Sequence, residues 1–150
     1  MFQGKDGCYA CAYLLGKIFL IKPMESAYLD VDSKWGVLVC YNYDTLDFDD
    51  IWAICKSFGM SDKSINKALQ ILSSYNTGMA VSSDDLRMSA IFISKATSPS
   101  EWWNTSIHEI KHVSDAIIRY YDVEWDGEDA AYLTGYLTKQ LVEKVSEPCY

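Results

Sequence analysis

The chain has 150 residues, enough for one domain with a substantial core, and 49% of them are hydrophobic, which excludes a disordered chain. A net charge of −8 argues against nucleic acid as the main partner, because a nucleic-acid-binding surface is basic. No stretch is long and apolar enough to span a membrane, and no secretory signal is visible. We therefore expect a single domain over residues 1–150, intracellular and without a membrane partner.

The five cysteines are an odd and scattered set, and without an export signal we expect no disulfide framework. Cys8 and Cys11 form a lone C-x-x-C pair. A zinc knuckle would need a second such pair, and a redox site would place the pair at a helix start after a buried strand. Buried or free thiols are the favoured interpretation, and a functional pair is the alternative.

The first predicted elements are two strands and a helix. Residues 16–21 could form a short strand that ends near Pro23, and residues 35–41 (W-G-V-L-V-C-Y) are rich in β-forming residues, which predicts a buried strand. Asp47 is the expected N-cap of the helix that follows, and Gly59 its expected end.

A second helix and a hairpin follow. Ser61 or Asp62 caps the helix, and the apolar residues on one of its faces are Ile65, Leu69 and Leu72. Residues 77–83 and 87–95 are predicted strands, and the turn-forming residues 83–85 between them favour a β-hairpin.

Two helices complete the chain. Ser98 and Glu101 form a capping box with Pro99 at the first helical position, so a long helix should run from here to about Tyr121. A last helix should begin near Glu128. The predicted fold is α+β, with a mixed sheet whose hairpin packs on the long helix.

Both histidines of the chain lie in the long helix, in the sequence His108-Glu109-Ile110-Lys111-His112, which is an H-E-x-x-H motif. Residues i and i+4 lie one turn apart on the same helical face, so two imidazoles could hold one zinc ion there. Glu109 is placed to act on a zinc-bound water. The alternative is a helix that carries two histidines and a glutamate by chance.

The helical phase separates this motif from the core. At about 100° per residue, His112, Asp115 and Arg119 all fall within about 40° of His108, on one side of the helix. The opposite side is apolar and consists of Trp103, Ile110, Val113 and Ile117. We therefore expect the histidines to face away from the core.

A catalytic zinc usually has three protein ligands, and no third histidine exists. Glu128 is the preferred third ligand, because an extended connection after the long helix could bring the start of the next helix back to the metal. Asp129 is the second choice, and both acids could instead cap the last helix. Asp115 could accept a hydrogen bond from a ligand imidazole.

The order His108-Glu109-x-x-His112 followed by Glu128-x-x-Ala131 resembles the gluzincin branch of the zincin metallopeptidases, in particular the small intracellular ImmA/IrrE-type forms. The resemblance covers roughly residues 77–145 and implies a zincin-like domain in which Glu128 completes the zinc site. Three positions depart from the usual pattern: Lys111 is charged, Ser114 is polar, and Tyr132 stands where some members have an aspartate.

The expected function is that of a zinc-dependent metallopeptidase acting on a peptide or protein. His108, His112 and Glu128 would hold the zinc, and Glu109 would transfer the proton of the attacking water to the leaving amine. The transition state needs a further donor, for which the candidates are Arg119, Tyr120, Tyr132 and Tyr136. Two alternatives stay open: a zinc hydrolase with a non-peptide substrate, and a non-enzymatic interaction or mobile-element (phage) protein with a structural or decayed zinc site.

Overall fold

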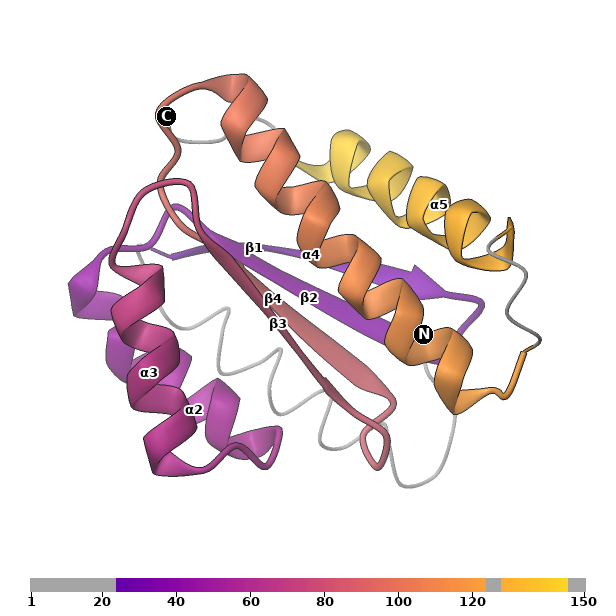
Figure 1. Cartoon of the computed structure of the whole chain (residues 1–150), viewed down its shortest axis with the longest axis horizontal. Helices are drawn as coiled ribbons and strands as arrows, with labels where there is room; N and C mark the ends of the chain where they lie inside the picture. The colour runs from indigo at the N-terminus through magenta and orange to yellow at the C-terminus, as the bar shows by residue number, and fades with distance from the viewer. Residues whose placement is uncertain (1–23, 124–127, 146–150) are drawn as a thin grey trace.

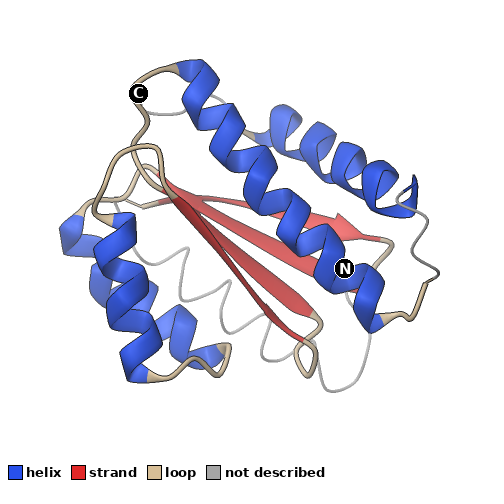
Figure 2. Ribbon diagram, viewed as in Figure 1, coloured by secondary structure: helices blue, strands red, loops and turns tan. Residues whose placement is uncertain are grey.

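The computed structural model describes residues 24–123 and 128–145, which form a four-stranded sheet with helices on both faces (Figures 1 and 2). The elements are β1 (Glu25–Val31), β2 (Trp35–Tyr41), the short 3-10 helix η1 (Thr45–Asp47), α2 (Phe48–Ser57), α3 (Asp62–Leu72), β3 (Gly78–Ser83), β4 (Met88–Ile93), α4 (Pro99–Tyr120) and α5 (Glu128–Lys144).

The sheet is mixed, with the strand order β1-β2-β4-β3. The β1–β2 and β3–β4 pairs are antiparallel hairpins, and β2 pairs with β4 in parallel. The predicted α+β class and mixed sheet are therefore confirmed. In the described part of the chain, β3 is an edge strand and β4 a central one.

Alternation along the strands produces two cores, one on each face of the sheet. Leu38 and Cys40 of β2 and Phe92 of β4 pack with the apolar residues of α2 and α3. Val37 and Val39 of β2 point the other way, towards α4 and α5. Both central strands are fully buried, as expected for strands covered on both faces.

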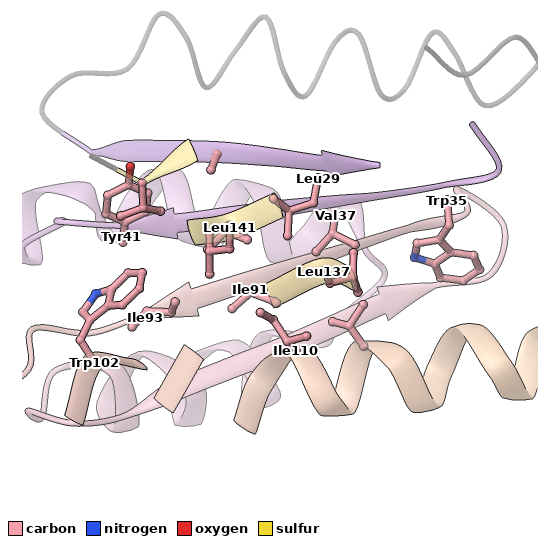
Figure 3. Close-up of a cluster of buried hydrophobic side chains, with 14 of the residues drawn as sticks. Leu29, Trp35, Val37, Tyr41, Ile91, Ile93, Trp102, Ile110, Leu137 and Leu141 are labelled. Carbon is pink, nitrogen blue, oxygen red and sulfur yellow. The ribbon is translucent and has the colours of Figure 1, made fainter. Parts of the chain in front are cut away.

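The core under α4 and α5 brings together side chains from three parts of the sequence (Figure 3). Trp102 and Ile110 come from α4, and Leu137 and Leu141 come from α5. Each is almost completely buried. A side chain of this size contributes about 1.5–3 kcal/mol when it is buried, so this face holds α4 firmly on the sheet.

Two helix starts follow the predicted chemistry, whereas Asp47, expected to cap α2, precedes that helix without a side-chain capping hydrogen bond and accepts from the Asp44 N–H instead. Ser98 caps α4, its hydroxyl accepting a hydrogen bond from the Glu101 N–H at 3.2 Å, and Pro99 begins the helix. Ser61 caps α3 in the same way. α5 is tied to the β1 edge of the sheet by Gln140, whose amide group donates to the Asp30 carbonyl and accepts from the Asp30 N–H.

Most predicted elements have a counterpart in the structure, but one predicted strand could not be compared and one observed strand was not predicted. The strand expected at residues 16–21 lies outside the described residues. β1, at Glu25–Val31, was not expected, although Ala27 and Leu29 alternate with exposed or half-buried residues as in a half-buried strand. In the described ranges, no helix has the length and apolar character required to cross a membrane.

Candidate functional site

The two histidines lie together on the exposed side of α4, as the helical phase predicts. Their Nε2 atoms are 3.1 Å apart, and the rings meet edge to face with centroids 4.8 Å apart. One neutral ring can donate a hydrogen bond to the other at this distance. The separation is also close to that of two nitrogen ligands bound to one metal ion.

Glu109 differs from its histidine neighbours because it is buried, with 7% of its surface exposed. Burial raises the pKa of its carboxyl, and the nearby His108 and His112 oppose this shift. A carboxylate held in an apolar environment is a stronger base than one in water. Glu109 therefore combines proximity to the imidazoles with an enhanced tendency to take up a proton.

Gly78 makes room for Glu109. α4 packs against β3, and a Cβ atom at Gly78 would lie 2.8 Å from Cγ of Glu109 and 2.8 Å from Cγ2 of Thr105. Both distances are too short for any side chain. The glycine at the start of the edge strand thus allows the carboxylate to lie directly against the sheet. The sequence contained this glycine, but nothing in its pattern indicated which helical residue it faces.

Asp115 was predicted to orient a ligand imidazole. In the structure its carboxylate accepts a hydrogen bond from Lys111, one turn earlier on α4, and the two form an ion pair. This i,i+4 pair also accounts for a charged residue inside the motif, because Lys111 is directed towards its acidic neighbour along the helix.

The expected three-ligand zinc centre is not assembled. Within residues 24–123 and 128–145, no group of three His, Cys, Asp or Glu side chains is placed to hold a metal ion. Glu128 and Asp129 are exposed at the start of α5 and do not join the two histidines in such a group.

The register of the two helices explains why. α5 runs antiparallel to α4 (Figure 1), and the Thr134 hydroxyl donates a hydrogen bond to the Ser114 hydroxyl at 3.0 Å. With this register, Glu128 lies level with the last turn of α4, about 12 Å along the axis from His112. For Glu128 to reach the metal, the segment between the helices would have to run back along the last turns of α4. Instead, α5 already begins at Glu128, beside the C-terminal end of α4.

The predicted transition-state donors are distributed over both helices. Tyr120 packs edge to face against Trp35, with ring centroids 5.4 Å apart, at the C-terminal end of α4. Arg119 is exposed on the same turn. Tyr132 and Tyr136 are exposed on α5. The role of each as a donor stays a prediction.

The described cysteines, Cys40 and Cys55, are buried thiols in the core beneath α2 and α3. Burial raises the pKa of Cys55 to about 11 and shifts the pKa of Cys40 upwards as well. Both are therefore protonated and unreactive at neutral pH. The Cys8–Cys11 pair lies outside the described residues.

Comparison with known proteins gives no family assignment: no protein-family model, curated protein or solved structure matches the chain. Together with the missing three-ligand group in the described ranges, this result shows that the resemblance to gluzincin metallopeptidases is wrong. The fold and the site define an α+β protein with an exposed histidine pair beside a buried glutamate.

Proposed function

We propose that the protein is a zinc-dependent hydrolase whose reactive centre consists of His108, Glu109 and His112. The observation that carries the proposal is the 3.1 Å separation of the two Nε2 atoms on an exposed helical face. Two nitrogen ligands at about 2.0–2.1 Å from a tetrahedral zinc lie about 3.3 Å apart, so the separation of the two imidazole nitrogens is already close to the one that a shared ion requires.

Zinc at this position would lower the pKa of a bound water towards about 7 and polarise the bond under attack. With two protein ligands, coordination positions are left for water and substrate. The exposed histidines give the substrate access, and the α4 helix fixes their spacing.

Glu109 is the proton carrier in this proposal. It accepts the proton of the attacking water and returns it to the leaving group. Its burial against Gly78 supports this role, because the close approach to β3 limits the positions that the carboxylate can take. A buried base also needs little reorganisation during the reaction.

The proposed substrate is a peptide bound in extended form. β3 is an edge strand in the described sheet, and Gly78, at its start, lies beside Glu109. An extended chain can add to such an edge through main-chain hydrogen bonds. A peptide bound along β3 would therefore pass close to the carboxylate.

Metal analysis and peptide hydrolysis together test the proposal. The purified protein should bind about one zinc ion per chain, and His108→Ala or His112→Ala should each abolish binding. Glu109→Gln should keep the zinc and lose cleavage of a fluorogenic peptide library by at least about a hundredfold. Absence of zinc binding in calorimetry, without chelators present, would refute the proposal.

Glu128→Ala is the matched control, since it removes a carboxylate that the helical register places about 12 Å from His112. We expect its zinc affinity to equal that of the unchanged protein. A large loss of zinc in this variant would contradict the two-histidine site.

A second candidate is a non-enzymatic interaction protein, which is favoured by the lack of a third ligand in the described ranges. In that case zinc binding, if present, would have no catalytic consequence. The protein would not cleave the peptide library, and Glu109→Gln would behave like the unchanged protein in every assay.

A further inference from the structure

A cavity lies on the opposite face of the sheet from the histidine pair. It has a volume of about 210 Å³ and is formed where β2 continues into η1 and where β4 and α3 end. Tyr43, Phe48 and Leu72 provide its apolar lining. Asp44, Lys95 and the hydroxyl-bearing residues Ser73 and Ser74 provide its polar lining.

The position of the cavity in the fold is one that favours ligand binding. β2 and β4 are parallel neighbours, so the segments that follow them leave the sheet at the same end, where the carboxyl ends of both strands lie. In open sheets of this kind, ligands bind beyond the carboxyl ends of parallel strands, where the connecting segments diverge. Tyr43 and Asp44 follow β2, and Lys95 follows β4.

The charges in the cavity lining define the ligand. Asp44 and Lys95 are both exposed and line the same cavity, and these two described residues form no ion pair with each other. Asp44 uses one carboxylate oxygen to cap η1 through the Leu46 N–H at 2.8 Å. The cavity thus offers one carboxylate and one ammonium group that do not neutralise each other. A ligand with one positive and one negative group is complementary to this pair.

The volume limits the size of this ligand. An apolar cavity of about 150 Å³ holds a benzene molecule, whereas sites for nucleotides and drug-sized ligands are about 300–1,000 Å³. About 210 Å³ therefore accommodates one ring with a short polar substituent. We propose that this cavity binds a free amino acid with an aromatic or large aliphatic side chain, with its ammonium at Asp44 and its carboxylate at Lys95.

Titration of the full chain with phenylalanine, followed by the amide resonances of Ser73, Ser74 and Lys95 in NMR spectra, tests the proposal. Saturable shifts are expected, with a Kd in the high micromolar to low millimolar range, as is typical of so small a ligand. Phenethylamine lacks the carboxylate, and hydrocinnamate lacks the ammonium. Each should bind at least about tenfold more weakly, and equal binding of all three compounds would overturn the proposal.

Two charge variants complete the test. Asp44→Asn removes the negative charge but keeps the η1 cap, because asparagine is an equally good N-cap residue. Lys95→Gln removes the positive charge. Each should weaken phenylalanine binding at least about tenfold, whereas Lys67→Gln, on the exposed face of α3, should leave it unchanged. Unaltered affinity in both cavity variants, or no saturable shifts at about 10 mM phenylalanine, would refute the site.

Discussion

At the scale of single residues, Gly78 has the largest effect on the candidate centre. Its missing side chain allows the Glu109 carboxylate to lie against β3, next to two imidazoles on the neighbouring exposed face. The geometry of the histidine pair comes from the helix alone, whereas the position of the glutamate depends on a residue 31 positions earlier in the sequence.

Gly78→Ala should therefore damage both stability and the site. The new Cβ would lie 2.8 Å from side-chain carbons of Glu109 and Thr105, so α4 or the carboxylate must move. Overpacking of this kind costs about 1–3 kcal/mol of unfolding free energy, measurable by urea denaturation. Peptide cleavage should fall with it, while zinc binding by the exposed histidines should change little.

Gly135→Ala is the control for this substitution. Gly135 lies inside α5, and a Cβ there would meet no atom of the described residues within 4 Å apart from its own helical backbone and chain neighbours. Alanine should stabilise the helix by about 0.5–1 kcal/mol. Destabilisation of similar size in both variants would show that the close approach at Gly78 is not the cause.

At the scale of elements, α4 depends on its first turn. The Ser98 hydroxyl accepts the Glu101 N–H, which would otherwise have no partner within the helix. Ser98→Ala should lower the unfolding free energy by about 1 kcal/mol, and Ser98→Asn should restore it, because asparagine caps equally well. Chemical denaturation followed by circular dichroism measures both, and failure of the asparagine variant to recover would disprove the capping role.

Local patterns were sufficient to predict most elements. The strand at 35–41, the helix that begins after Asp47, the hairpin of β3 and β4, and the capped start of α4 all follow from turn residues, caps and periodicity within a few positions. Two features that depend on long-range packing were not predicted correctly: the position of Glu128 was predicted wrongly, and the burial of Glu109 was not predicted. The position of Glu128 depends on the register between α4 and α5, which the Ser114–Thr134 contact marks. The burial of Glu109 depends on which strand α4 packs against.

The zinc site illustrates the same limit. A helix guarantees that His108 and His112 lie on one face, and the structure shows them 3.1 Å apart. A third ligand has to come from another element, so its position depends on tertiary packing. The H-E-x-x-H motif therefore predicted the pair correctly but not a complete metal centre.

At the scale of the whole molecule, the two cores share the same strands. Ile91 packs under α4 and α5, and the next residue, Phe92, packs under α2 and α3. Leu137→Ala in one core and Ile65→Ala in the other should each lower the unfolding free energy by about 2–5 kcal/mol. In both variants, fluorescence and far-ultraviolet circular dichroism should report one coincident transition, since neither face can keep its core without the sheet. Separate transitions would show that the faces unfold independently.

The parallel pairing of β2 with β4 has a consequence for how the chain reaches this structure. Each hairpin can form from neighbouring residues, but Gly36 must find Met88, 52 positions further along the sequence. Closing a chain segment of this length costs roughly 3–4 kcal/mol of entropy before the paired strands gain any contact. The joining of the two hairpins is therefore the step expected to limit the folding rate. Until it is complete, the inner edges of β2 and β4 offer unpaired backbone groups to other chains, so the newly made protein is most prone to aggregate before its candidate centre exists.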